Sequence, residues 1–162
     1  MGSAVPLRSF PFSAVGAVER LAALYRSQPA SARDAHPGSG EPARILVVED
    51  DYLIALQVET ALAEAGFHVV GVAASAEEAT ELAGAHQPDL VVMDIRLSGT
   101  RDGIDLAIEL YRDYAIRCLF ATAHADAQAR RRAEPADPLG WLQKPYTMAS
   151  LVGMVRGALD LS

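Results

Sequence analysis

The chain has 162 residues, of which 51% are hydrophobic and 22% charged, proportions typical of one soluble globular domain with some excess length. Its 21 acidic residues outnumber 14 basic ones. The net charge of −7 argues against nonspecific binding to nucleic acid or to an anionic membrane, because both need a basic surface. No apolar run reaches the roughly 18 residues that a membrane-spanning helix needs. Thirteen basic residues are arginine and one is lysine, Lys144, so the position of that lysine is informative.

The cysteine content indicates a reducing compartment. Cys118 is the only cysteine, so no intrachain disulfide can form. The N-terminus has no basic start followed by an apolar core, so no secretory signal is predicted. We therefore expect a cytoplasmic protein.

The composition changes near residue 43. Residues 27–42 are rich in Pro, Gly and small polar residues, as linkers are. The segment before them has apolar side chains at helical spacing: Val15, Val18, Leu21, Ala22 and Tyr25. We predict an N-terminal extension over 1–42, with a short amphipathic helix at about 13–27 and then a linker, ahead of a domain over 43–162. The helix could pack on that domain, pair with a second chain or fold only with a partner.

Apolar runs and amphipathic segments alternate from residue 44 onward. The runs are continuous, as expected of parallel strands buried on both faces, and the segments repeat apolar residues at helical intervals. Gly66 marks the end of the first helix, and Ser75 with Glu78 forms a capping-box pattern at the start of the second. In chain order the predicted elements are a strand at 44–49, a helix at 52–66, a strand at 68–74, a helix at 75–87, a strand at 89–94, a helix at 103–114, a strand at 116–123, a short helix at 125–134, a strand at 139–143 and a helix at 147–161.

This alternation predicts an α/β fold, a doubly wound five-stranded parallel sheet with strand order 2-1-3-4-5, which is flavodoxin-like. Sites in such sheets lie at the carboxyl ends of the strands, beside the point where the strand order reverses. The ends of the first, third, fourth and fifth strands are therefore where we expect chemistry.

Those four strand ends have polar side chains of complementary chemistry. Glu49 and Asp50 follow the first strand, Asp94 ends the third, Thr122 lies near the end of the fourth, and Lys144 follows the fifth. Carboxylates that converge without a cation repel one another, and Mg²⁺ with oxygen ligands relieves that repulsion. A carboxylate beside Mg²⁺, an ammonium group and a hydroxyl can accept a phosphoryl group, because the positive charges neutralise its oxygens.

Other charged residues are interpreted as structural. Asp51 directly precedes the first helix and is predicted to cap it. Arg130, Arg131 and Arg132 are interpreted as a solvated face of the short helix rather than a nucleic-acid patch. If that helix belongs to an exposed output face, these arginines could pair with acidic residues of a partner.

Asp50, Asp94, Thr122 and Lys144 follow one another at gaps of 44, 28 and 22 residues. Their order and spacing resemble the receiver domain of two-component response regulators, and the resemblance covers roughly residues 44–162. It implies that Asp94 is the phosphoacceptor and that one Mg²⁺ binds beside it.

The resemblance also assigns the metal ligands. Asp50 would bind Mg²⁺ directly and Glu49 through water. Asp94 itself and the backbone carbonyl of Arg96 would complete the ligands that the protein supplies.

Further residues would hold the phosphoryl group. Thr122, Ala123 and Lys144 lie at the family's phosphoryl-binding positions. The Lys144–Pro145 peptide bond is usually cis in this family, which would direct the lysine across the site.

Three positions depart from the usual family pattern. The family has a Tyr or Phe three residues before the conserved lysine, where this chain has Trp141. This residue is either a core aromatic or part of a switch that moves together with Thr122. Arg96 and His124 occupy positions that tune the lifetime of the phosphoryl group, and their side chains could shield it or orient a water towards it. They could equally be solvated surface residues.

The strand segment Phe120-Ala121-Thr122 resembles the start of the motif of an alphaproteobacterial receiver subgroup, the FATGUY family. Ala123, His124 and Ala125 depart from the rest of that motif.

The function implied by the resemblance is that of a stand-alone receiver, since the sequence ends at Ser162. A sensor histidine kinase or a histidine phosphotransfer protein would phosphorylate Asp94. The phosphorylated chain would change its binding to a downstream protein, or to a second copy of itself, through 125–134, 139–143 and 147–161. Alternatively it would act as a phosphate sink, and neither nucleic acid nor membrane is an expected partner.

Two alternatives use the same residues. A Mg²⁺-dependent phosphohydrolase with an aspartyl nucleophile, as in the haloacid dehalogenase group, places a second Asp two residues after the nucleophile, where this chain has Arg96. A degenerate receiver that serves only for protein binding would not need Asp50, Asp94, Thr122 and Lys144 intact. We therefore expect a signalling domain rather than an enzyme with turnover.

Overall fold

Five parallel strands form one sheet in the order β2-β1-β3-β4-β5. The strands are β1 (Arg44–Val48), β2 (His68–Ala73), β3 (Leu90–Met93), β4 (Cys118–Thr122) and β5 (Gly140–Gln143). The predicted α/β fold and its strand order 2-1-3-4-5 are therefore confirmed. The computed structural model describes residues 40–160, so the helix expected at about 13–27 lies outside the described residues.

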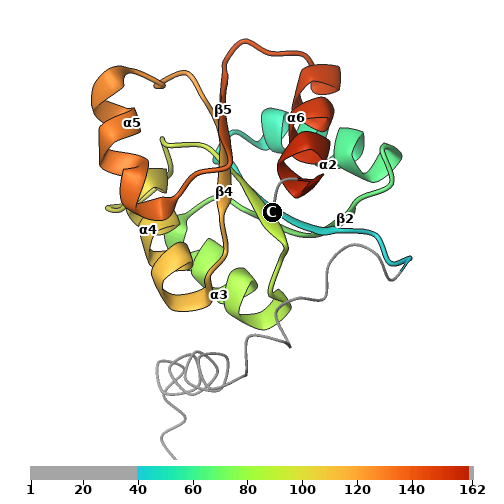
Figure 1. Ribbon diagram of the computed structural model, residues 1–162, viewed down its shortest axis with the longest axis horizontal. Coiled ribbons are helices and arrows are strands. Elements are labelled where there is room, and N and C mark those ends of the chain that lie inside the picture. Colours follow the sequence, from blue (N-terminus) through green and yellow to red (C-terminus); the bar gives the residue numbers. More distant parts are fainter. Residues whose placement is uncertain (1–39, 161–162) are drawn as a thin grey trace, which may run out of the picture.

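Helices cover both faces of the sheet (Figure 1). They are α2 (Tyr52–Glu64), α3 (Ala76–His86), α4 (Gly103–Tyr114), α5 (Ala127–Ala133) and α6 (Met148–Asp160), with a short 3-10 helix η2 (Glu134–Ala136) after α5. One face packs against α3, α4 and α5, and the other packs against α2 and α6. No helix within residues 40–160 is long and apolar enough to cross a membrane.

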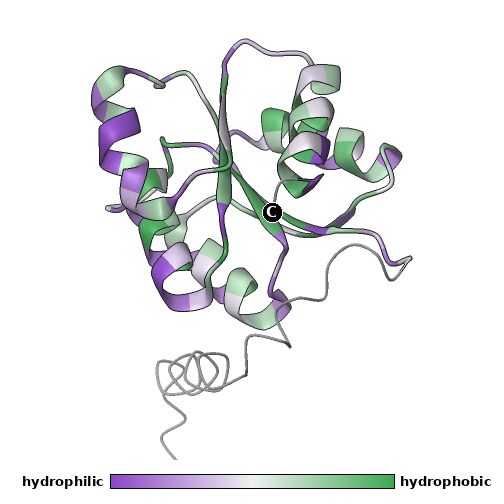
Figure 2. Cartoon of the chain, in the orientation of Figure 1, coloured by the Kyte–Doolittle hydropathy of each residue, from purple (hydrophilic) through white to green (hydrophobic). Residues whose placement is uncertain are grey.

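The strands are apolar along most of their length because each contributes to two cores. In β1, Leu46 and Val48 belong to the core under α3, α4 and α5. Ile45 and Val47 belong to the core under α2 and α6. Successive side chains of a strand point to opposite faces, so a strand covered on both sides has no polar face. The hydropathy view shows this pattern, with hydrophobic residues along the strands inside the two helical layers (Figure 2).

Side-chain caps determine where the helices begin. The Asp51 carboxylate accepts hydrogen bonds from the backbone N–H groups of Leu53 and Ile54, which confirms the predicted cap of α2. The Ser75 hydroxyl accepts from the Glu78 N–H at 3.3 Å. The return bond of the predicted capping box differs by one residue, because the Glu78 carboxylate accepts from the N–H of Ala74.

The helix expected at 125–134 is shorter than predicted. Asp126 caps it by accepting from the N–H of Ala129, so α5 begins at Ala127. After Ala133 the chain tightens into the 3-10 turn that contains Pro135, because a proline ring is incompatible with a continued α-helix.

Candidate functional site

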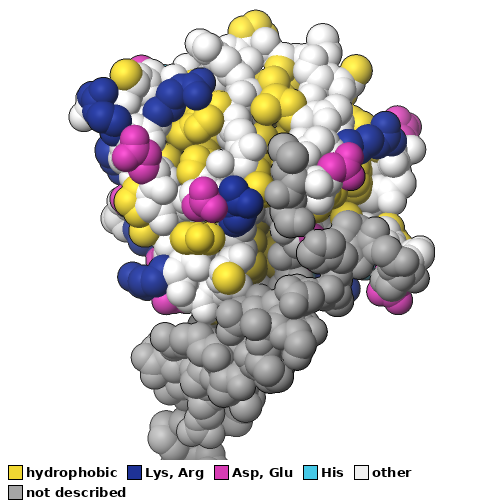
Figure 3. Space-filling view, viewed as in Figure 1, with side chains coloured by type: hydrophobic (Ala, Val, Ile, Leu, Met, Phe, Trp, Pro, Cys, Tyr) yellow, Lys and Arg dark blue, Asp and Glu magenta, His cyan; other side chains and the backbone are white. Residues whose placement is uncertain are grey.

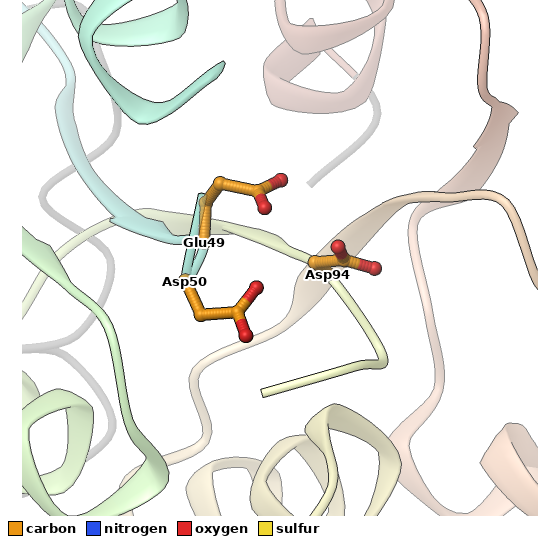
Figure 4. A group of neighbouring side chains, drawn as sticks. All are labelled: Glu49, Asp50 and Asp94. Carbon is orange, nitrogen blue, oxygen red and sulfur yellow. The ribbon is translucent and has the colours of Figure 1, made fainter. Parts of the chain in front are cut away.

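Three carboxylates meet where β1 and β3 end. The two strands are adjacent and parallel, Val48 pairs with Met93, and the Asp94 N–H donates to the Val48 carbonyl at 2.9 Å. The residues that follow each strand therefore lie side by side. Carboxylate oxygens of Glu49, Asp50 and Asp94 lie within 4.8 Å of one another, and the side chains of Glu49 and Asp50 extend toward the side on which Asp94 lies (Figure 4).

The single lysine lies against two of these carboxylates. The Lys144 Nζ atom donates to Glu49 Oε2 at 2.6 Å and to Asp94 Oδ2 at 2.9 Å. Glu49 and Asp94 are only 6% and 7% exposed, so these are ion pairs with little water around them. The Lys144–Pro145 peptide bond is cis, and the Lys144 N–H donates to the Thr122 carbonyl at 2.9 Å.

The site has more negative than positive charge. Burial raises the pKa of Glu49, and the Asp94 charge adds to this, although the hydrogen bonds from Lys144 and from the Asp51 N–H partly offset it. Burial by itself lowers the pKa of Lys144, but its hydrogen bonds to Glu49 and Asp94 and their charges outweigh burial, so that pKa is raised. Three carboxylates against one ammonium group leave an excess that a hard divalent cation matches, and all the donor atoms are oxygen. The residues present therefore fit Mg²⁺.

The residues at the end of β4 lie beside this cluster. Thr122 is fully buried, and its hydroxyl accepts from the His124 N–H at 3.1 Å. Ala123 is exposed and lines a groove together with Lys144. His124 lines a different hollow, which Asp50 also lines.

Arg96 lies at the same edge of the sheet. Its backbone N–H donates to Asp94 Oδ1 at a long 3.4 Å, and Arg96, which is exposed, lines the same hollow as His124. Its carbonyl remains a predicted metal ligand. Ser98, which the sequence interpretation missed, reaches Asp50 Oδ2 with its hydroxyl at 3.4 Å.

Trp141 lies outside the carboxylate cluster. It pairs with Phe120 across β4 and β5, and the two rings stack with centroids 4.4 Å apart and an interplanar angle of 20°. The Arg130 guanidinium carbon also lies over the Trp141 ring, 5.0 Å from its centroid. Sequence reasoning missed this arginine contact.

Gly103 is a second residue that sequence reasoning missed. A Cβ atom added to it would lie 2.0 Å from the Asp94 carbonyl oxygen, and its N–H donates to the Ile95 carbonyl at 2.7 Å. The first turn of α4 thus packs directly on the backbone of Asp94, and only glycine fits there. A glycine just after Asp102, the residue that caps α4, was the available sequence signal.

Apolar residues surround the open side of the site. A groove between α2 and the start of α6 is lined by Ile54, Gln57, Ala123, Lys144, Pro145, Tyr146 and Met148. Tyr52, Leu53 and Leu56 of α2 lie nearby in sequence and are 75%, 68% and 44% exposed. They are the large hydrophobic side chains that residues 40–160 leave most exposed.

Comparisons with known proteins agree with this geometry. A family model described as the response regulator receiver domain matches residues 45–156. The transcriptional regulatory protein PdtaR of Mycobacterium tuberculosis is 36% identical over 119 residues, which are 74% of this chain and 58% of that protein. The phyllosphere-induced regulator PhyR of Methylorubrum extorquens is 29% identical over 116 residues, 71% of this chain and 43% of that protein. The chain thus spans about half the length of these curated relatives.

Solved structures show the same similarity. The receiver domain of a modulated diguanylate cyclase from Desulfovibrio desulfuricans has a TM-score of 0.69 and 30% identity, covering 75% of this chain and 96% of that one. The receiver domain of the response regulator NarL from Mycobacterium tuberculosis has a TM-score of 0.67 and 31% identity, covering 74% and 98%. The resemblance to the FATGUY subgroup remains a prediction.

Proposed function

Because the chain belongs to the response regulator receiver family, the signalling domains of two-component systems, we propose that Asp94 accepts a phosphoryl group from a sensor histidine kinase or a histidine phosphotransfer protein. The observation that carries this proposal is the contact between Lys144 Nζ and Asp94 Oδ2 inside a cluster of three carboxylates.

The transfer is a displacement at phosphorus. An Asp94 carboxylate oxygen attacks, the bond between phosphorus and the donor's imidazole nitrogen breaks, and that nitrogen keeps the electron pair. The Lys144 ammonium neutralises the oxygens of the transferring group, and the Thr122 hydroxyl and the Ala123 N–H donate to them. Glu49, Asp50, Asp94 and the carbonyl of Arg96 would hold Mg²⁺, which supplies further positive charge beside those oxygens.

A donor protein has to reach the open side of this site. The groove beside Lys144 and the exposed Tyr52, Leu53 and Leu56 offer an apolar surface at that side. Exposed apolar patches of this kind are typical of protein–protein contacts. We propose that the phosphodonor protein contacts α2 and the start of α6.

The output would follow from a change around Thr122 and Trp141. The aspartyl phosphate would shift the population of conformations at the end of β4 and on the surface of α5, β5 and α6. Binding of a downstream protein or of a second copy would then change, or the chain would drain phosphate from a kinase. We place this activity in the cytoplasm, where the buried thiol of Cys118 stays reduced.

The proposed domain spans 43–162, with the extension at 1–42. The start of β1 at Arg44 and the start of the family match at residue 45 support this boundary.

The test is incubation of the full chain with Mg²⁺ and acetyl phosphate, followed by measurement of bound phosphate. We expect one labile phosphate per wild-type chain. Asp94→Asn should take up none, and wild type should take up none when EDTA removes the Mg²⁺. Asp89→Asn is the matched control, because Asp89 lies at the opposite end of β3 and accepts from the Arg44 N–H. Multiple turnovers would favour the phosphohydrolase instead, and no uptake would favour a binding module without phosphorylation.

A further inference from the structure

The loop over residues 94–102 contains two of the predicted Mg²⁺ ligands. It begins with Asp94 and includes Arg96, whose carbonyl is a predicted ligand. The loop is closed at its base, where the Gly103 N–H donates to the Ile95 carbonyl at 2.7 Å. This bond fixes where the chain leaves β3 and enters α4, but it does not fix the path of the residues between them. The position of the Arg96 carbonyl therefore depends on further contacts.

The middle of the loop has few strong contacts. The Ser98 hydroxyl donates to Asp50 Oδ2 at 3.4 Å, which is longer than the roughly 2.8 Å that is typical between oxygens. Ser98 also forms a parallel bridge with Ser75, the residue that caps α3. Leu97 is half-buried against the core under α3, α4 and α5. Residues 98–100 are exposed, so burial does little to hold them.

Arg101 connects the end of this loop to two helices. Its Nε–H donates to Glu77 Oε1 of α3 at 3.2 Å, and its Nη1 donates to Glu109 Oε2 of α4. The side chains of Arg101 and Glu109 are 32% and 27% exposed, so water screens this pair less than it screens fully exposed pairs. A guanidinium has a planar head group with fixed donor directions, so it can hold two carboxylates in a defined geometry.

Arg132 is a useful comparison, because it also pairs with two carboxylates. It extends from α5 to Asp102 at 2.9 Å and to Asp105 at 3.3 Å. The space-filling view shows acidic and basic side chains close together over α5 (Figure 3). Both carboxylates that Arg132 contacts lie at the start of α4, so these pairs do not connect the loop to α3.

We propose that Arg101 is a positioning residue for Mg²⁺, because its pairs with α3 and α4 hold the loop that presents the Arg96 carbonyl. The inference rests on the proposed function, which includes Mg²⁺ at the carboxylate cluster, and it deepens that function by adding a residue that does not itself touch the metal. Partners that orient metal ligands from outside the coordination shell commonly change metal affinity when they are replaced.

The expected change in affinity has a sign that charge alone would not produce. Arg101 lines the same hollow as Asp50, so its positive charge opposes the binding of a cation there. Removing that charge would by itself tighten Mg²⁺ binding. Loss of the contacts that hold the loop would weaken it, so the direction of the change separates the two effects.

The experiment is calorimetric titration of the full-length chain with Mg²⁺ alone, in the absence of any phosphodonor. Urea unfolding in EDTA shows, for each variant, that the chain is folded under the conditions of the titration. The matched control is Arg132→Gln, which removes one positive charge and two carboxylate pairs. The test variants are Arg101→Gln, Arg101→Lys, Glu77→Gln and the double variant Arg101→Gln/Glu77→Gln.

We expect Arg101→Gln to raise the dissociation constant for Mg²⁺ by about threefold to tenfold, at the low end of what replacing an orienting partner costs, because only one ligand position is loosened. Arg101→Lys should lie between wild type and Arg101→Gln, since an ammonium keeps the charge and loses the fixed donor directions. Arg132→Gln should bind Mg²⁺ as tightly as wild type or tighter. In the Glu77→Gln background, Arg101→Gln should have a smaller effect, because the contact with α3 is already lost.

Equal or tighter Mg²⁺ binding by Arg101→Gln would overturn the inference alone, since only the charge effect would remain. An equal loss of affinity in Arg132→Gln, or full additivity of Arg101→Gln and Glu77→Gln, would overturn it as well. A merely structural role would lower the free energy of unfolding without changing the Mg²⁺ affinity of the folded chain.

If Arg101→Gln did not fold, Arg101→Lys would replace it in the test, and an affinity equal to that of wild type would overturn the inference. Failure of wild type to bind Mg²⁺ would instead overturn the proposed function, and the role of Arg101 with it.

Discussion

Lys144 is the only lysine of the chain, and its ammonium group lies between Glu49 and Asp94. The arginines that make up the rest of the basic residues have a planar, wider head group with several fixed donor directions. A compact ammonium fits between two carboxylate oxygens that lie 2.6 and 2.9 Å away. The only lysine of the chain therefore lies where a compact positive charge fits better than the wider head group of arginine.

Removal of this charge should tighten Mg²⁺ binding while it impairs phosphoryl transfer. In Lys144→Met, three carboxylates remain without a protein cation, so the metal relieves more repulsion than it does in wild type. We expect the dissociation constant for Mg²⁺ to fall by roughly threefold to tenfold, about 1 kcal/mol after allowance for solvent screening. Calorimetric titration measures this constant, and Arg131→Met serves as a control for net charge. An unchanged or weaker affinity in Lys144→Met would contradict the charge argument.

The free energy of unfolding of Lys144→Met should depend on pH in the same direction as that of wild type, but more strongly. Burial raises the pKa of Glu49 above 4.5, and loss of the Lys144 hydrogen bond raises it further. The folded chain then keeps a proton that the unfolded chain releases, so the free energy of unfolding falls as the pH rises from about 4.5 towards the raised pKa. Urea unfolding in EDTA from pH 4 to pH 8 tests this by comparing Lys144→Met with wild type. Adding Glu49→Gln to the variant should abolish the extra dependence, and its persistence would assign it to another group.

Gly103 should tolerate no side chain. A Cβ atom there would lie 2.0 Å from the Asp94 carbonyl oxygen, so the backbone of the phosphoacceptor has to move. We expect Gly103→Ala to lower the free energy of unfolding by about 1–3 kcal/mol and to reduce phosphate uptake. The control is Gly153→Ala in α6, where open space surrounds the new methyl group and the helix gains about 0.5–1 kcal/mol. Urea unfolding measures the free energy of unfolding of both variants. If Gly103→Ala and Gly153→Ala changed it equally, the close approach of Gly103 to Asp94 would be unimportant for stability.

At the scale of elements, α2 has two apolar faces with different roles. Ala55, Val58 and Leu62 face the core, whereas Tyr52, Leu53 and Leu56 are exposed beside the candidate site. Exposed apolar side chains contribute little to folding, and their place on α2 supports the proposed contact with a phosphodonor protein.

A charged residue on this exposed face should slow phosphoryl transfer from protein donors and leave transfer from small-molecule donors unchanged. We expect Leu53→Glu to slow phosphoryl transfer from a kinase or phosphotransfer protein by about tenfold or more, a loss typical of an interface residue that contributes more than 1 kcal/mol. Uptake from acetyl phosphate should not change, because the Leu53 side chain is exposed and does not line the groove beside Lys144. Gln128→Glu places the same charge on exposed α5 and serves as the control. Slower uptake from acetyl phosphate in Leu53→Glu would show that the substitution disturbs the site itself.

The fold could be predicted from the sequence because burial and capping are local signals. Continuous apolar runs indicated strands covered on both faces, and Asp51 marked a helix start that the structure confirms. Strand order followed from the number of alternating elements. The first and last residues of the elements could be predicted less accurately. The start of α5, for example, depends on whether Asp126 or an earlier residue provides the cap.

Contacts between side chains of distant elements could not be predicted. The stacking of Trp141 on Phe120 depends on the register of β4 and β5, which apolar runs do not reveal. The approach of Gly103 to Asp94 depends on the path of the loop over residues 94–102, between β3 and α4. The contact between Lys144 and Glu49 joins residues 95 positions apart and depends on the sheet that brings the ends of β1 and β5 together.

At the scale of the whole molecule, two cores lie on opposite faces of one sheet, and β4 contributes to both. Cys118 and Phe120 face the core under α3, α4 and α5, whereas Leu119 and Ala121 face the core under α2 and α6. Because β4 pairs with β3 on one side and β5 on the other, exposing its side chains requires separation of several elements. Opening of β4 should therefore require most of the global unfolding free energy.

The thiol of Cys118 tests that expectation. Burial raises its pKa from 9.0 to about 12, so at pH 8 only about one folded chain in ten thousand has the reactive thiolate. We expect a disulfide reagent to label native Cys118 slowly at pH 8, and urea to accelerate labelling in parallel with unfolding. Ser150→Cys adds an exposed thiol on α6 to the same chain as an internal control, so labelling should show one fast and one slow phase. If both thiols reacted in the fast phase without urea, β4 would open locally, and the two cores would not unfold as one unit.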